Sequence, residues 1–402
     1  MDVLARPTSS QGGFSLIRVD RLGLLIALLA VYAMAGSPFV TFRANRIVPG
    51  EGVSLWDAFP AALAYGTIAV VLAACVIALM RLSAPIRAAT GLLVVACLFL
   101  LVGLAGGHLL PAGDKLARVS PGSGFWLVGL AFSLLSVDGL SRMSLRPLLR
   151  VALLASVVGA VCAALALGAW DDLSIMSEYR NRADSFWAEA ATHLQLAFGS
   201  MLAAVLVGVP LGLLCFRLPS ARSAILSILN TIQTVPSMAM FGLMIAPLGW
   251  IALNIPGASA LGIRGIGAAP AFIALFLYSL LPVVANTVAG LAGVPSMVRE
   301  AARGMGMTWG QKLMRVELPI AFPVMLTGVR IVLVQNIGLV TIAALIGGGG
   351  FGVFVFQGIG QMAMDLVLLG AIPTVALAFC TAMILDALIE AAWVPAQQDG
   401  AS

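Results

Sequence analysis

Long apolar runs separated by short polar segments make up most of the chain. Runs of roughly 17–25 uncharged residues are long enough to cross a bilayer as helices, and the pattern predicts ten of them. The expected spans are residues 22–40, 58–80, 88–108, 121–138, 149–170, 191–216, 223–248, 267–291, 319–345 and 366–389. The uncharged run at 223–263 exceeds one span, and Asn254, Pro256 and Gly257 supply its break. We therefore expect an all-α, polytopic helical membrane protein.

The composition agrees with this interpretation. Of the 402 residues 61% are hydrophobic and only 10% are charged, whereas soluble domains carry about 25% charged residues. The five cysteines lie inside apolar runs without metal-ligand spacing, and there are only two histidines. We therefore expect no metal site, and we interpret the cysteines as small buried apolar residues.

Polar residues divide the chain into regions. Residues 171–190 form a polar segment, which we expect to be an external linker. It follows an N-terminal block, residues 1–170, with about five generic apolar spans. Residues 191–392 carry polar, proline and glycine residues inside their spans, so we expect function there, and residues 393–402 are a short tail.

Basic residues indicate the orientation. With the N-terminus inside, fourteen of the 22 Lys and Arg residues fall in inner segments, seven in outer ones and Arg330 within a span. This bias places both termini in the cytoplasm of an inner (cytoplasmic) membrane. Ala33, Met34 and Ala35 are typical of a signal-peptide cleavage site, but the apolar run continues to Val40, which favours a retained first helix.

One polar segment, residues 295–319, is a charged island between two uncharged runs. Its charged residues are Arg299, Glu300, Arg303, Lys312, Arg315 and Glu317. Charges are costly in hydrocarbon, so the segment must lie in water. Thr308 and Gln311 predict a capping box that opens a second short helix. The island is either an ordinary amphipathic loop or a docking surface, with two alanines forming a low-profile face that enters a groove of a partner.

The spacing within the island is specific: Glu-Ala-Ala, three residues, Gly, nine residues, then Val-x-Leu-Pro. It resembles the EAA loop of permease subunits of binding-protein-dependent ABC importers. The resemblance implies a type I importer permease core in the second half, with a cytoplasmic coupling loop at 295–319. The ATPase-coupling residues that it implies are Glu300, Ala301, Ala302, Gly306, Leu318 and Pro319.

Further segments resemble the osmoprotectant branch of these permeases, whose members import glycine betaine, choline or carnitine. They include 230–237, 278–282, 328–338 and 346–352. The resemblance covers about residues 190–390, and a longer subgroup with extra N-terminal helices fits the whole chain. It implies a permease that passes a small zwitterionic or quaternary-ammonium solute, together with an external solute-binding protein and a second permease copy or sister permease.

The chain lacks the Gly-Lys-Ser/Thr segment with which a P-loop holds phosphates. We therefore expect a non-catalytic transport subunit without a cofactor of its own, with ATP and magnesium bound by a pair of partner ATPase subunits. No aromatic cage for a quaternary ammonium is evident, which assigns solute selection to the external binding protein.

Polar residues inside the second-half spans are candidates for the translocation pathway. They are Gln233, Thr234, Pro236, Ser237, Asn286 and Asn336. A structural alternative exists for each, because such side chains also satisfy carbonyls freed at a proline or join neighbouring helices.

Three alternative functions remain at this point. The same machinery could import another small solute, such as an amino acid derivative. A standalone secondary transporter should show inverted repeats and intramembrane acidic residues coupled to ions, and a membrane-embedded enzyme should show a catalytic constellation. Neither pattern is evident in the sequence.

Overall fold

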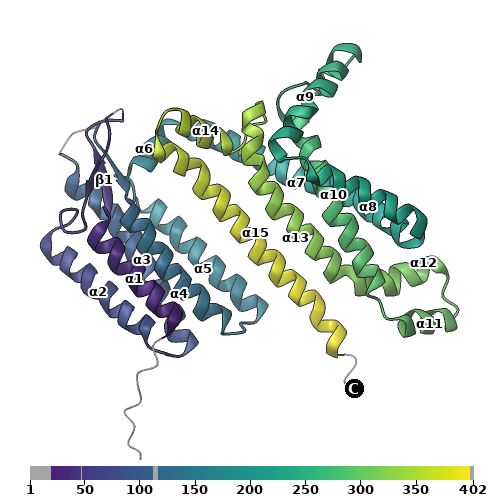
Figure 1. The fold of residues 1–402 in the computed structure, drawn as a ribbon, viewed down its shortest axis with the longest axis horizontal. Helices are drawn as coiled ribbons and strands as arrows, with labels where there is room; N and C mark the ends of the chain where they lie inside the picture. Colours follow the sequence, from purple (N-terminus) through teal and green to yellow (C-terminus); the bar gives the residue numbers. More distant parts are fainter. Residues whose placement is uncertain (1–19, 47, 112–115, 399–402) are drawn as a thin grey trace, which may run out of the picture. The chain divides into compact units, whose positions relative to one another are not determined.

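The computed structural model describes residues 20–46, 48–111 and 116–398 (Figure 1). The chain forms two compact units, Met1–Leu145 with Leu165–Leu173, and Arg146–Ala164 with Ser174–Ser402. Among the described residues, nine helices are long and apolar enough to cross a membrane, and one further apolar helix has 16 residues. The prediction of a polytopic helical membrane protein is confirmed.

The first unit is a helical bundle with a small sheet at one end (Figure 1). Its elements are α1 (Arg21–Gly36), β1 (Val40–Arg43), β2 (Glu51–Val53), α2 (Ala61–Leu79), α3 (Ala84–Leu109), β3 (Arg118–Pro121) and α4 (Ser123–Ser141). The strands are antiparallel in the order β2-β1-β3. An all-α fold does not predict this sheet, because strands of three or four residues are too short to show an alternating pattern.

A buried arginine ties the helices of the first unit together. Arg87 of α3 is only 2% exposed, and its Nη2 lies 2.6 Å from Asp20 at the start of α1. Its Nε donates to Asp138 of α4 at 3.0 Å, and its Nη1 donates to the Ala78 carbonyl of α2. One guanidinium therefore joins four helix ends, and the acids around it offset the cost of burying it.

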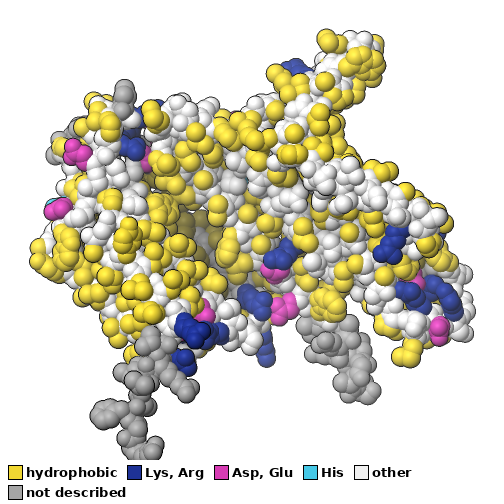
Figure 2. All heavy atoms as spheres, viewed as in Figure 1, with side chains coloured by type: hydrophobic (Ala, Val, Ile, Leu, Met, Phe, Trp, Pro, Cys, Tyr) yellow, Lys and Arg dark blue, Asp and Glu magenta, His cyan; other side chains and the backbone are white. Residues whose placement is uncertain are grey.

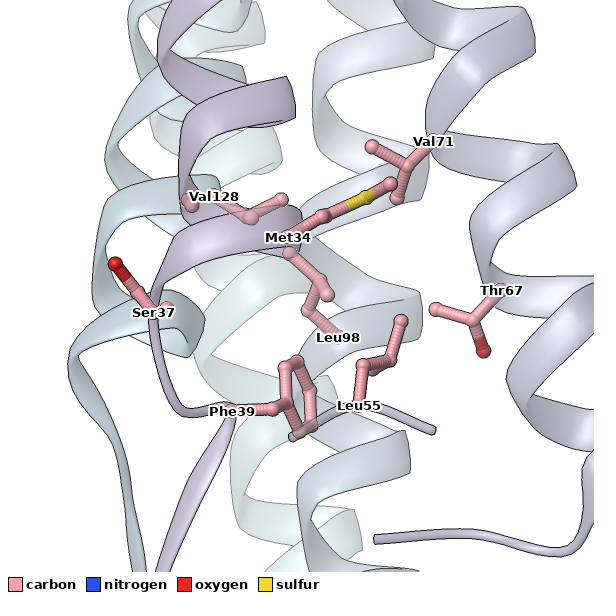
Figure 3. A pocket seen from close by; sticks show the side chains of 10 residues that line it. Met34, Ser37, Phe39, Leu55, Thr67, Val71, Leu98 and Val128 are labelled. Carbon is pink, nitrogen blue, oxygen red and sulfur yellow. The ribbon is translucent and has the colours of Figure 1, made fainter. Parts of the chain in front are cut away.

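The apolar side chains inside this unit leave little room. Met34, Phe39, Leu55, Val71 and Leu98 point toward one small space between the helices (Figure 3), whose volume is about 10 Å³. A cavity of that size holds a single water at most. A second space, of about 320 Å³, is an open apolar groove between α2 and α3. Neither offers the convergent polar groups that a zwitterionic solute requires.

The second unit is all helical. Its elements are α5 (Pro147–Ala166), α6 (Ser174–Asn181), α7 (Ala183–Arg217), α8 (Pro219–Thr234), α9 (Ser237–Asn254), α10 (Ala268–Ala292), α11 (Ser296–Gly304), α12 (Trp309–Lys312), the π-helical turn η1 (Leu313–Glu317), α13 (Leu318–Ala343), the 3₁₀ turn η2 (Ala344–Ile346), α14 (Gly352–Gly360) and α15 (Met364–Gln398).

Helix α10 packs against both α7 and α13 to form the centre of this unit. Gly208 and Gly212, four residues apart on α7, meet Val283 and Thr287 of α10. A Cβ at Gly212 would lie 2.6 Å from the Thr287 Cβ. Small residues at this spacing let two membrane helices approach closely. The helices α11 and α12 lie at one end of this core, and α9 and α14 at the other (Figure 1).

Four details differ from the sequence-based expectations. The single span expected at 223–248 is wrong, because the chain breaks after Thr234, before Pro236, and forms α8 and α9. The segment 171–190 is folded into α6 and the start of α7. Helix α5 groups with the second unit and not with the N-terminal block. Helix α15 continues to Gln398, into the segment expected to be a tail, of which 399–402 lie outside the described residues.

Candidate functional site

Residues 295–319, the charged island of the sequence, fold into a compact elbow of short helices and turns. Helix α11 ends at Gly304, the chain turns through Gly306 with a φ of +73°, and α12 and η1 lead into α13. The predicted capping box is confirmed: Thr308 N donates to Gln311 Oε1 at 2.8 Å, and Gln311 N donates to Thr308 Oγ1 at 3.4 Å. The elbow therefore has a defined shape of its own.

Half of the charges in the elbow interact with one another. The Glu317 carboxylate is 5% exposed, and its Oε1 lies 3.5 Å from Lys312 Nζ and 3.7 Å from Arg299 Nε. Arg299 also donates to the Leu291 carbonyl at the end of α10. This cluster joins α11, η1 and α10, and it fixes the angle at which the elbow enters α13.

Two cation–π contacts attach the elbow to the end of α7. The Arg217 guanidinium carbon lies 3.2 Å from the centre of the Trp309 ring, and that of Arg299 lies 5.3 Å from the centre of the Phe216 ring. Both distances are within the range for a favourable contact. The elbow therefore contacts the ends of α7 and α10 as well as continuing into α13.

The remaining charges of the elbow face outward. Glu300, Arg303 and Arg315 are exposed, and Figure 2 shows basic and acidic side chains gathered over α11 and α12. Three methionines are also exposed in this segment: Met297, Met305 and Met314. The sequence analysis missed them, although methionines in a charged aqueous segment were a visible signal. Flexible apolar side chains beside mixed charges are typical of surfaces that bind a protein partner.

The structure corrects one feature of the predicted docking face. Ala301 is exposed but Ala302 is 1% exposed and packs inside the elbow. Consecutive helical residues point about 100° apart, so the two alanines do not form one face. Ala302 also accepts a hydrogen bond from Met307 N at 3.2 Å, which closes the turn. Pro319 lies in the first turn of α13, where its missing N–H costs nothing, and Leu318 opens that helix.

Among the predicted pathway residues, Asn336 is fully buried. Its Nδ2 lies 2.9 Å from Ser200 Oγ of α7 and 2.9 Å from Ser279 Oγ of α10. Three central helices are thus joined by one buried polar cluster. This geometry favours the structural alternative for Asn336.

Gln233 and Pro236 lie at the break between α8 and α9. Gln233 Nε2 donates to the Tyr278 carbonyl at 2.7 Å, and the Tyr278 hydroxyl donates to the Val235 carbonyl. The break is therefore fixed to α10 by side chains that satisfy its carbonyls. Thr234 donates to Thr231 O on its own helix and is exposed, and Ser237 begins α9.

Asn286 donates to Pro282 O at 2.8 Å within α10. Gly328 of α13 packs on it, because a Cβ there would lie 2.8 Å from the Asn286 Cβ. In the part of the chain that the structure describes, no hydrogen bond joins any two of the six predicted pathway residues. Their role in transport stays a prediction.

The structure adds a groove of mixed character that the sequence analysis did not select. It lies between α8 and α10, has a volume of about 530 Å³ and is widely open to solvent. Arg222, Ser223, Ser227 and Asn230 line its α8 side together with Pro219 and Leu226. They recur at helical spacing on one face, whereas Leu281 and Ala285 of α10 line the other side.

Across residues 20–46, 48–111 and 116–398 no group of three His, Cys, Asp or Glu side chains is placed to hold a metal ion. Arg330 of α13, the basic residue expected within a span, pairs with Asp386 of α15 at 2.8 Å.

Two family models match the chain. Residues 20–176 match the N-terminal domain of the ABC transporter permease YehY, and residues 204–392 match the inner membrane component of binding-protein-dependent transport systems. The osmoprotectant import permease protein OsmW of Salmonella typhimurium is 42% identical over 180 residues, which is 45% of this chain and 79% of that protein.

The choline transport system permease protein OpuBB of Bacillus subtilis is 37% identical over 186 residues, which is 46% of this chain and 78% of that protein. Among solved structures, the MetNI methionine ABC transporter in an inward-facing conformation has a chain that is 20% identical with a TM-score of 0.45. The match covers 52% of this chain and 95% of that chain.

Proposed function

Because the chain belongs to the family of inner membrane permeases of binding-protein-dependent transport systems, we propose that it passes a small zwitterionic or quaternary-ammonium osmoprotectant, similar to glycine betaine, into the cell. As a permease it is a multi-pass, non-catalytic subunit, and the energy for import comes from ATP hydrolysed on a partner. The relatives named for osmoprotectant and choline transport support this class of solute.

The observation that carries this proposal is the division of charge in the elbow. Arg299, Lys312 and Glu317 hold its shape, whereas Glu300, Arg303 and Arg315 stay exposed beside three exposed methionines. A loop that only connected two spans would need neither the rigid frame nor the apolar surface. Together they suit a groove on an ATPase subunit, which binds ATP and magnesium.

Helix α13 provides the path by which the motion of the ATPase reaches the membrane. It begins at the elbow and runs 26 residues, or about 39 Å at 1.5 Å per residue. The cluster of Glu317 with Lys312 and Arg299 makes α13, α11 and the end of α10 move as one body. A push on the elbow therefore displaces the central helices of the transport unit.

The groove on α8 supplies a row of polar side chains along which a solute can pass. Its hydroxyl, amide and guanidinium groups suit the carboxylate of a zwitterion, and Asn230 lies one turn before Gln233 and Thr234. In the orientation that the basic residues predict, both termini and the elbow are cytoplasmic. A second copy of this chain or a sister permease then faces the groove, and an external solute-binding protein delivers the solute.

Reconstitution in proteoliposomes tests the proposal. The permease, its co-purifying ATPase and the solute receptor encoded with it are assembled, and uptake of radiolabelled glycine betaine, choline, carnitine and a panel of amino acids is measured with ATP. We expect uptake of at least one quaternary ammonium that needs ATP, and uptake lowered about tenfold in Glu300→Ala with normal membrane insertion. ATP-driven uptake of amino acids alone would contradict the solute class, and uptake by the permease without an ATPase would contradict the mechanism.

A further inference from the structure

The end of α13 opposite the elbow reaches a glycine-rich turn, residues 347–350, which leads into α14. Gly347, Gly349 and Gly350 have φ values between +77° and +83°, a region that other residues rarely adopt. The turn is held on two sides: Gly348 N donates to Ala343 O of α13, and Gly267 N, at the start of α10, donates to Ile346 O, both at 2.9 Å.

Two side chains of α7 hold the third side of this turn. The Glu189 carboxylate accepts a hydrogen bond from Gly350 N at 2.5 Å, and His193 Nδ1 accepts one from Phe351 N at 3.2 Å. Glu189 and His193 are four residues apart, so they share one face of α7. His193 is fully buried, and its ring lies 5.0 Å from that of Phe351.

These contacts satisfy the N–H groups of Gly350 and Phe351, the two residues that precede α14. Without them the two donors would lack partners in a region with little water, which is costly. The contact is also close, because a Cβ at Gly349 would lie 2.9 Å from Glu189 Oε2 and from the Thr192 side chain. Glycine is therefore required both by the backbone conformation and by the approach of α7.

The two ends of α13 are thus attached to the same helix. The elbow contacts the end of α7 through Arg217, and the glycine-rich turn contacts its other half through Glu189 and His193. Because α13 is a continuous helix, a displacement of the elbow must either carry α7 along or break these contacts. Hydrogen bonds at these distances are lost within a shift of about 1 Å.

We propose that Glu189 and His193 are positioning residues that latch the glycine-rich turn, and with it the outer end of α13, to α7, and that transport requires this latch. The inference rests on the proposed function as an ATP-driven importer. With the latch in place, motion of the elbow moves the outer ends of α7 and α13 together. Without it, ATP is hydrolysed but the outer end of α13 does not follow.

The test compares Glu189→Ala, Glu189→Gln and His193→Ala in the complete complex with ATPase and receptor. Uptake and ATP hydrolysis are measured on the same proteoliposomes and expressed as solute imported per ATP hydrolysed. We expect this ratio to fall at least about tenfold in Glu189→Ala, the change that corresponds to losing one hydrogen bond to a charged group. The ratio should also fall in His193→Ala. In Glu189→Gln, which keeps an acceptor, the ratio should stay within about threefold of that of the unmodified protein.

Ser174→Ala is the matched control. Ser174 donates a buried hydrogen bond to Asp365 at 2.7 Å in the same unit but does not contact the turn, so its ratio should equal that of the unmodified protein. An unchanged ratio in Glu189→Ala, or a loss in Glu189→Gln as large as in Glu189→Ala, would overturn the latch. The latch would also be overturned if the Glu189→Ala complex assembled in a smaller amount but kept the normal ratio of solute imported to ATP hydrolysed. Absence of ATP-driven uptake by the unmodified complex would instead reject the proposed function.

Discussion

Both units of the chain contain a buried ion cluster, but the clusters have different surroundings. In the first unit Arg87 is enclosed by Asp20 and Asp138, and Asp138 is also held by Arg142 at 2.8 Å. In the elbow Glu317 is held by Arg299 and Lys312, and a second set of charges and three methionines surrounds the cluster and faces outward. The first cluster joins helices, whereas the second also supports an exposed surface.

The difference between the two clusters separates charged residues that stabilise the fold from charged residues that are exposed to a partner. A charge that is paired and buried contributes to structure, and replacing one partner of such a pair is expensive. A charge left exposed beside apolar side chains contributes little to the stability of the fold, so it is available to a partner. By this criterion we expect the described part of the first unit to serve as a scaffold, and we propose that the elbow is the surface on which the ATPase acts.

The largest effect is expected from Arg87→Met. This change leaves Asp20 without its cation and Asp138 with Arg142 alone, and breaking a buried pair on one side costs about 3–5 kcal/mol. We expect a large fall in the unfolding temperature of the detergent-solubilised protein and in its amount in the membrane. Arg142→Met, which removes only an exposed partner, should change stability by less than about 1 kcal/mol. Equal stability of the two variants would contradict the scaffold role.

Glu317→Gln should have the next largest effect. It leaves Lys312 and Arg299 without a counter-charge, at a cost of about 2–3 kcal/mol because Arg299 keeps some contact with water. We expect a lower unfolding temperature together with loss of ATP-driven uptake, since the elbow loses its fixed angle. If stability falls while uptake per folded complex stays normal, the cluster does not set the docking geometry.

Glu300→Ala separates binding from folding. The side chain is exposed, so stability should change by less than about 0.5 kcal/mol, whereas uptake should fall about tenfold if the residue is a contact in the interface. Asp184→Ala, which removes an exposed acid of α7, is the control and should leave both unchanged. Uptake by Glu300→Ala equal to that of the control would argue for a solvated loop.

Thr308→Ala should have the smallest effect. Loss of the N-cap hydrogen bond costs about 1 kcal/mol, and Thr308→Ser should restore most of it. The measurement is the rate of proteolysis within the elbow. This rate should rise in the alanine variant and should be close to that of the unmodified protein in the serine variant. An identical rate in all three proteins would show that the capping box does not limit opening of the elbow.

The sequence predicted those features that depend on neighbouring residues. The spans other than 223–248, the charged island and the capping box of Thr308 and Gln311 are local patterns, and the structure contains them. Features that join distant segments could not be predicted: Glu189 meets Gly350 across 161 residues, and Asn336 meets Ser200 across 136. The same limit left both interpretations of Asn336 open in the sequence, because its burial depends on two helices that the sequence does not place beside it.

Site-specific photo-crosslinking tests the central claim most directly. A photoreactive amino acid is placed at Met305, which is exposed on the elbow, or at Met362, which is exposed between α14 and α15, and the complex is irradiated in native membranes. We predict an adduct with the ATPase from position 305 and none from position 362. An adduct only from position 362, or none from any exposed position of the elbow, would contradict the claim that this surface receives the ATPase.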